Sequence, residues 1–130
     1  MVSTVIAGQH VLIALVSLAA LVVTVSAAPV FEGKYASSKG GYRQSAEIAR
    51  AGAGYSVSLV VGTEGCSGLF EGTGTIQGGR LIARTSDPDA ADDKCRIEIS
   101  RTAKGIVVNE DACEYWHGPS CGFDGSLRKR

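Results

Sequence analysis

The chain contains few of the side chains that carry enzyme chemistry. Only 6% of its residues are aromatic, it has a single Trp, and of its two His residues only His117 lies beyond the N-terminal segment. A hydrolase would have to combine His117 with a nucleophile such as Ser120, which follows a proline and precedes a cysteine. That is not the strand–turn–helix setting of a nucleophilic serine. We therefore predict that the protein is not an enzyme, with a hydrolase as the alternative.

An excess of charge of either sign is also absent. The 13 basic residues balance the 13 acidic ones, whereas a protein that binds nucleic acid needs a basic surface. The charges are grouped into an acidic run between Asp87 and Asp93 and a basic end from Arg128 to Arg130. We interpret the first as a solvated loop and the second as a solvated tail. The sequence thus predicts no nucleic-acid partner.

Motifs for a metal or a cofactor are missing as well. No two cysteines have the close C-x-x-C spacing of a zinc site, and no other motif indicates a cofactor. The four cysteines are Cys66, Cys95, Cys113 and Cys121. An even number of cysteines in a short chain favours two disulfides, for which three pairings are open. We favour Cys113–Cys121, which closes a short loop, together with Cys66–Cys95.

Basic residues are absent from the start of the chain, where its one long apolar run lies. The run from Val11 to Val25 is too short to span a bilayer comfortably, but it has the length of the apolar part of a secretory signal. Val25 and Ala27 suit the −3 and −1 positions of a cleavage site. We predict a signal peptide over residues 1–27, with an uncleaved anchor as the alternative. The protein is then periplasmic or secreted, without a membrane span in residues 28–130.

Residues 28–130 are predicted to form one all-β domain. The segment Tyr55–Val61 begins with alternating apolar and polar residues, the period of a half-buried strand. The pair Gly78-Gly79 joins two strand-like runs in a tight hairpin. Seven or eight short antiparallel strands favour a meander closed into a small barrel, with a β-sandwich as the alternative. The predicted strands are Phe31–Ala36, Tyr42–Arg50, Tyr55–Val61, Leu69–Gln77, Arg80–Thr85, Lys94–Thr102, Ile106–Asn109 and Gly122–Arg128.

The most distinctive segment is the loop from Cys113 to Cys121, which holds Tyr115, Trp116 and His117. A disulfide across this loop would display its aromatic residues rigidly. Trp116 is either an exposed anchor of the kind found at binding hot spots or a plug for one end of the barrel. His117 is either a structural hydrogen-bonding group or a contact to a carboxylate of a partner. All three are candidate binding residues.

A second glycine-rich loop is predicted over Gly62–Gly68, with Ser67 and Gly68 as candidate binding residues. Its G-C-S-G sequence and the closing segment C-x-Y-W-H-G-P-S-C-x-F-x-G-x-L-R at Cys113–Arg128 resemble small exported bacterial proteins. The general build is similar to that of the periplasmic lysozyme inhibitors, small β-barrel or sandwich proteins that insert a loop into the lysozyme cleft. The resemblance implies that Ser67 or Tyr115 lies on a contacting surface.

The sequence therefore favours an exported, disulfide-stabilised protein that binds another protein, with a lysozyme-type hydrolase as the candidate partner. Two other hypotheses stay open. A small-ligand barrel would enclose an apolar cavity of at least about 300 Å³, lined by Val57, Leu59, Ile97 and Ile99. An envelope structural protein without a discrete site would bury Trp116.

Overall fold

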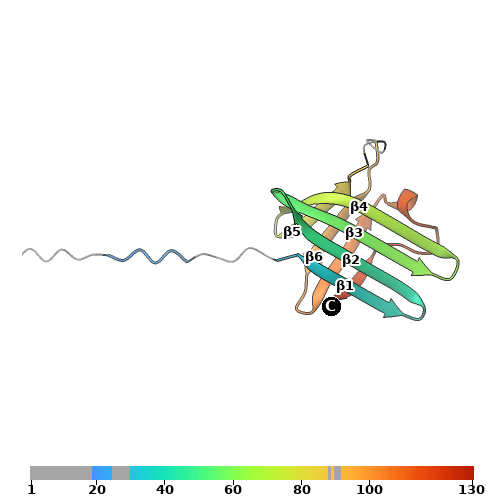
Figure 1. Cartoon of the computed structure of the whole chain (residues 1–130), viewed down its shortest axis with the longest axis horizontal. Coiled ribbons are helices and arrows are strands. Elements are labelled where there is room, and N and C mark those ends of the chain that lie inside the picture. The colour runs from blue at the N-terminus through green and yellow to red at the C-terminus, as the bar shows by residue number, and fades with distance from the viewer. Residues whose placement is uncertain (1–18, 25–29, 88, 90–91) are drawn as a thin grey trace, which may run out of the picture.

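The protein folds into a closed antiparallel barrel of eight strands (Figure 1). The computed structural model describes residues 19–24, 30–87, 89 and 92–130. Each strand pairs with the next along the chain, and β8 returns to pair with β1. The predicted all-β meander is confirmed, and it closes as a barrel and not as a sandwich. The strands are β1 (Gly33–Lys39), β2 (Tyr42–Ala51), β3 (Gly54–Thr63), β4 (Cys66–Gln77), β5 (Arg80–Thr85), β6 (Arg96–Arg101), β7 (Gly105–Asp111) and β8 (Gly125–Lys129).

The N-terminal segment contributes no described strand or helix ahead of the barrel. Residues 19–24 have no regular secondary structure. The rest of the predicted signal peptide, with its cleavage site after Ala27, lies outside the described residues. Within the part of the chain that the structure describes, no helix is long and apolar enough to cross a membrane.

Alternation along each strand separates the barrel interior from its outer face. In β3, Tyr55, Val57, Leu59 and Val61 are buried, whereas Val60 between the last two is 47% exposed. Successive residues of a strand point to opposite faces, so the apolar set of each strand fills the interior. The outer face is left to small and polar residues with a few apolar exceptions.

The four side chains considered for a ligand cavity belong to the packed core. Val57, Leu59, Ile97 and Ile99 are each at most 2% exposed, and they share one buried cluster with Phe70. Five surface hollows of the described residues, including the two discussed below, are lined by other side chains. These residues therefore stabilise the barrel by packing and do not line an apolar pocket.

Glycine pairs make the tightest turns of the meander. Gly40-Gly41 joins β1 to β2, and Gly78-Gly79 joins β4 to β5, with φ angles between 58° and 81°. A two-residue hairpin of type I′ needs positive φ at both positions, which glycine adopts without steric cost. The turn predicted at Gly78-Gly79 is thus confirmed, and the equivalent turn at Gly40-Gly41 has the same cause.

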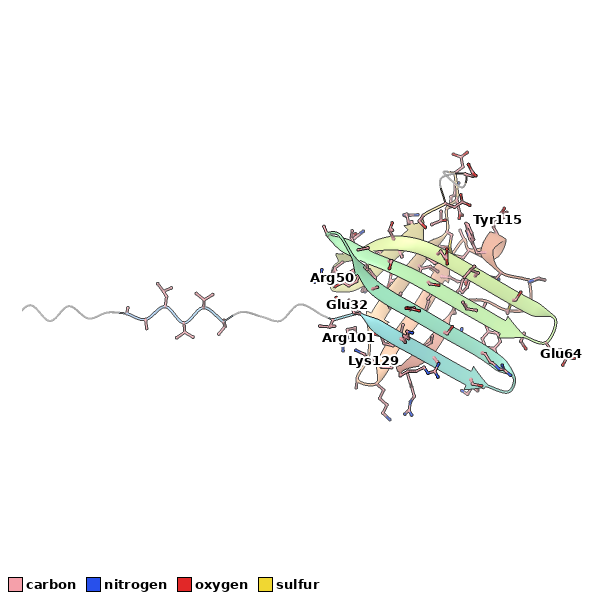
Figure 2. The ribbon with its side chains drawn as sticks, viewed as in Figure 1. Glu32, Arg50, Glu64, Arg101, Tyr115 and Lys129 are labelled. Atoms are coloured by element: carbon pink, nitrogen blue, oxygen red, sulfur yellow. A yellow bond between two sulfur atoms is a disulfide. The ribbon has the colours of Figure 1, made fainter. Side chains whose placement is uncertain are left out.

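The glycine-rich loop predicted over Gly62–Gly68 is mostly strand. β3 continues to Thr63 and β4 begins at Cys66, so only Glu64 and Gly65 remain for the turn. Glu64 lies at the tip of this hairpin in Figure 2. Glycine composition suggested a loop here, but pairing with β3 continues through the glycines. Ser67 and Gly68 are therefore strand residues.

The disulfides do not follow the predicted pairing, although their number is confirmed. Cys66 is bonded to Cys121 and Cys95 to Cys113, with Cα–Cα distances of 6.0 and 4.4 Å. The register between β6 and β7 brings Cys95 and Cys113, which lie just outside the paired residues, close together. The predicted Cys113–Cys121 and Cys66–Cys95 bonds are wrong, because strand register and not sequence distance decides which cysteines meet.

Candidate functional site

The segment Cys113–Cys121, called the 113–121 loop below, is attached to the barrel at both ends. Its first residue is bonded to Cys95 just before β6, and its last residue is bonded to Cys66 at the start of β4. Between them lies η2 (Glu114–Trp116), a single 3₁₀ turn. The loop was predicted to be closed on itself. It is instead held by two separate bonds to two different strands.

Trp116 fixes the first half of the loop. Its indole N–H donates a hydrogen bond to the carboxylate of Asp93, and its backbone N–H donates to the Cys113 carbonyl at 2.9 Å. Its ring is half-buried and meets the buried Phe70 edge to face, with ring centroids 6.4 Å apart. Trp116 is therefore neither a free anchor nor a complete plug, because it packs on the core with one side and faces solvent with the other.

His117 fixes the middle of the loop to β7. Its Nε2 lies 2.7 Å from Oε1 of Glu110, and its Nδ1 lies 2.7 Å from the carbonyl oxygen of Gly118. Only the imidazolium carries a hydrogen on both nitrogens, so this form satisfies both acceptors at once. Burial lowers the pKa of His117, but the hydrogen bonds to Gly118 and Glu110 outweigh burial and raise the pKa above its usual value.

Glu110 is a connecting residue that sequence reasoning missed. Its second carboxylate oxygen accepts the Phe123 N–H at 2.6 Å, while its own backbone N–H donates to Asp124 at 2.7 Å. The only hint in the sequence was its position at the end of a strand, directly before the loop. Its carboxylate accepts hydrogen bonds from His117 in the loop and from Phe123 in the segment leading to β8. Glu110 therefore links these two segments to β7.

Two polar side chains of β2, the half-buried Tyr42 and the buried Gln44, support the segment that follows the loop. The Gln44 amide, on a side chain only 7% exposed, donates to the Asp124 carbonyl at 2.8 Å. The Tyr42 hydroxyl accepts the Gly122 N–H at 2.9 Å and donates to the carbonyl of the same residue. Both side chains reach inward from β2, far away in sequence. The sequence gave no sign of this support, since a glutamine in an alternating strand looks like a surface residue.

Ser67 and Gly68 lie directly against the 113–121 loop. Gly68 forms a bridge with His117, and the Gly118 N–H donates to the Ser67 carbonyl at 3.1 Å. A Cβ on Gly68 would lie 2.5 Å from Cβ of His117 and 2.9 Å from the Trp116 carbonyl oxygen. The loop can therefore approach β4 only because residue 68 is glycine. Two segments far apart in the sequence form one continuous surface.

No family model, curated protein or solved structure matches this chain. The resemblance to periplasmic lysozyme inhibitors consequently stays a prediction that rests on the residues quoted for it. Any function has to be argued from the geometry of the loop itself.

Of the three candidate residues in the 113–121 loop, only Tyr115 is exposed. Its side chain is 84% exposed, and its ring stands edge to face on Trp116 with centroids 5.3 Å apart. Figure 2 shows it pointing away from the barrel. A hollow of about 440 Å³ separates Tyr115 from the acidic segment before β6. This hollow is lined by Asp87, Asp89, Asp92, Asp93, Lys94 and Tyr115.

The arrangement is suited to recognition and poorly suited to acid–base chemistry. Both nitrogens of His117 are occupied by acceptors within the protein, so neither is left to take a proton from a nucleophile. Among the residues that the structure describes, no group of three or more His, Cys, Asp or Glu is placed to hold a metal ion. What remains is an aromatic side chain held on a fixed loop beside an acidic surface.

Proposed function

We propose that the protein is an exported binding protein that contacts another protein through the 113–121 loop, with a lysozyme-type hydrolase as the candidate partner. The observation that supports this proposal best is the 84% exposure of Tyr115 on a loop bonded to the barrel at both ends. Leaving a large aromatic side chain in water has no benefit for folding. Tyrosine is enriched among the residues that dominate binding energies at protein interfaces.

The loop's internal contacts would reduce the entropic cost of binding. Side chains and loops that become ordered in a complex lower its affinity. Here the Cys95–Cys113 disulfide holds the backbone before Tyr115, and the hydrogen bonds of Trp116 and His117 hold the backbone after it, before any partner arrives. Tyrosine adds a large contact area with only two rotatable side-chain angles. The exposed residues Pro119 and Ser120 extend the same surface.

Charge favours a partner with a basic surface around its binding site. Four aspartates line the hollow beside Tyr115, opposed by one lysine. Complementary potentials accelerate encounter and suppress wrong partners, and their effect weakens as salt is added. A complex formed through this surface should therefore associate more slowly at high ionic strength.

The direct test measures cell-wall lysis by lysozymes of each known class in the presence of the purified protein. We expect one class to be inhibited, and Tyr115→Ala to weaken inhibition by about thirtyfold, the effect of truncating a hot spot of about 2 kcal/mol. Ile76→Ala, which shortens another exposed apolar side chain on β4, is the matched control. Absence of inhibition in every class would remove the lysozyme assignment, and equal inhibition by the two variants would remove the loop from the contact.

A further inference from the structure

A groove lies on the outer face of β1, β2 and β3. It has a volume of about 990 Å³ and is open to solvent. These strands lie side by side in Figure 1. Tyr115, Trp116 and His117 do not line it. The groove is therefore a surface separate from the proposed protein-binding loop, although Ser67 borders both.

Strand register explains why this face is hollowed. Ser38, Arg43, Gly62 and Ser67 form one outward row across β1 to β4. The neighbouring row consists of Ala36, Ser45 and Val60. Small side chains form the floor between longer ones. At Gly62 an added Cβ would meet no atom within 4 Å, and its φ is not in the left-handed region.

Two arginines border the groove without an internal partner. Arg43 and Arg130 are exposed, and within the described residues neither forms an ion pair. The Arg130 N–H donates to the Lys34 carbonyl at 2.9 Å, which fixes its backbone beside β1. Glu64 is the only carboxylate side chain on the groove wall. Arg130 also lines an adjoining hollow, together with Lys34 and Glu47.

We propose that this groove binds an acidic saccharide. The guanidinium groups of Arg43 and Arg130 would hold carboxylate or phosphate groups, for which arginine supplies a planar pair of donors. The hydroxyls of Ser38, Ser45 and Ser67 face the same space as the arginines and supply hydrogen-bonding groups for sugar hydroxyls. The volume falls in the range of small-molecule sites, about 300–1,000 Å³.

A saccharide fits this lining better than an acidic peptide. A peptide recognised by a sheet adds to a free strand edge, where backbone groups supply the affinity. Here β2 and β3 have a partner strand on both sides, and β1 is paired with β2 throughout and with β8 at Tyr35 and Ala36, which leaves residues 37–39 without a partner strand on that side. Side chains therefore supply most of the groups on offer. The offered groups are hydroxyls, guanidinium groups and two small apolar surfaces at Ala36 and Val60. These groups match the hydroxyls, acid groups and C–H faces of a charged sugar.

The first experiment compares a charged with a neutral sugar by titration calorimetry on the purified protein at low salt. Trigalacturonic acid is the charged probe and maltotriose the neutral one, and glucose 6-phosphate tests whether phosphate serves as the acid group. We expect trigalacturonic acid to bind at least about tenfold more tightly than maltotriose, since charge-assisted hydrogen bonds are roughly twice as strong as neutral ones. Equal affinities, or no binding of any charged probe, would overturn the proposal.

The second experiment places the ligand in the groove. Gly62→Leu, whose Cβ would lie in open space, should fill the floor and reduce affinity for trigalacturonic acid by at least tenfold, an effect on the order of one lost anchoring contact. Arg43→Ala should give a similar loss, and Arg84→Ala on β5 is the matched control. Arg43 is exposed, so its variant tests the proposal even where Gly62→Leu does not fold. Unchanged binding by Arg43→Ala would overturn the proposal. The proposal would also be overturned if the purified protein is a dimer and Gly62→Leu dissociates it, because a second copy of the chain would then occupy the groove.

Discussion

The two ends of the 113–121 loop are attached by disulfides that are both buried but differ in how completely they are shielded from solvent. At the first end, Cys95 and Cys113 are both 0% exposed. At the other end, Cys66 and Cys121 are 8% and 7% exposed, and Cys66 borders the large outer groove. The first bond links residues 18 apart in sequence, and the second links residues 55 apart. The bond that solvent reaches more easily is thus the one that restrains the longer segment.

This difference shows that burial of the sulfur atoms and restraint of the unfolded chain contribute separately to the stability of the loop. A disulfide stabilises mainly by lowering the entropy of the unfolded chain, and the effect grows with the length of the closed segment. Burial adds packing of the sulfur atoms in the folded state. The four predictions below separate these contributions, beginning with the largest expected effect.

Removal of the disulfides should have the largest effect. Replacing Cys66 and Cys121 together by alanine should lower the free energy of unfolding by about 4 kcal/mol, and the Cys95 and Cys113 pair by about 3 kcal/mol, following the dependence on segment length. Urea unfolding at a fixed temperature measures both. A larger loss at Cys95 and Cys113 would mean that packing of the buried sulfurs outweighs chain restraint, and the comparison would be reversed.

Replacing His117 should lower the free energy of unfolding by about 2 kcal/mol at a pH where the imidazole is charged, as expected for the loss of hydrogen bonds from a charged group. The folded state raises the pKa of His117, so this stability is fully present below the unfolded value of about 6.5. It is lost as pH rises through the higher pKa of the folded state. The difference in unfolding free energy between the protein and His117→Gln should therefore be larger at pH 5.5 than at pH 9. An unchanged difference would show that the imidazolium has no special role.

Loss of the indole hydrogen bond should weaken only the first end of the loop. Trp116→Phe keeps an aromatic ring next to Phe70 but removes the donor to Asp93, and we expect a loss of about 1 kcal/mol. Hydrogen exchange should then increase at residues 114–116 and stay unchanged at Gly118, which bonds to Ser67. Exchange that increases equally at both ends would show that the two attachments act as one unit.

Truncation of Tyr115 should have the smallest effect on stability. Tyr115→Ala removes a side chain that is 84% exposed, and surface substitutions of this kind change the free energy of unfolding by no more than about 0.5 kcal/mol. The midpoint of thermal unfolding should be nearly that of the unsubstituted protein. A clear decrease would mean that packing of Tyr115 on Trp116 stabilises the fold, and the case for a binding role would weaken.

The barrel could be predicted from sequence because its determinants are local. Alternation in Tyr55–Val61 and the glycine pair at Gly78-Gly79 specify strands and turns without knowledge of distant residues. The contacts of the loop depend on distant residues. Asp93 and Trp116 are 23 positions apart, and Gln44 and Asp124 are 80 apart. Asp93 was interpreted as part of a solvated run because nothing near it in sequence reveals its partner.

The candidate binding surface could also be predicted only in part from the sequence. Tyr115, Trp116 and His117 stand out by composition, and the structure places Ser67 and Gly68 beside them. Only the barrel reveals that Tyr115 projects while the next two side chains pack inward. The disulfides were predicted from the distance between cysteines in the sequence. That prediction was wrong because the pairing register of β6 and β7 decides which cysteine lies next to Cys113.

The connectivity of the cysteines has a consequence for the path by which the chain folds. Short loops close more readily than long ones in an unfolded chain, and Cys113 and Cys121 are the closest cysteines in the sequence. The first bond to form during oxidation is therefore expected to be a non-native one. Reaching the native pairs requires thiol–disulfide exchange, which is slow without a catalyst. Recovery of the native protein should thus depend on a disulfide isomerase, because the barrel must pair its strands before the correct cysteines can meet.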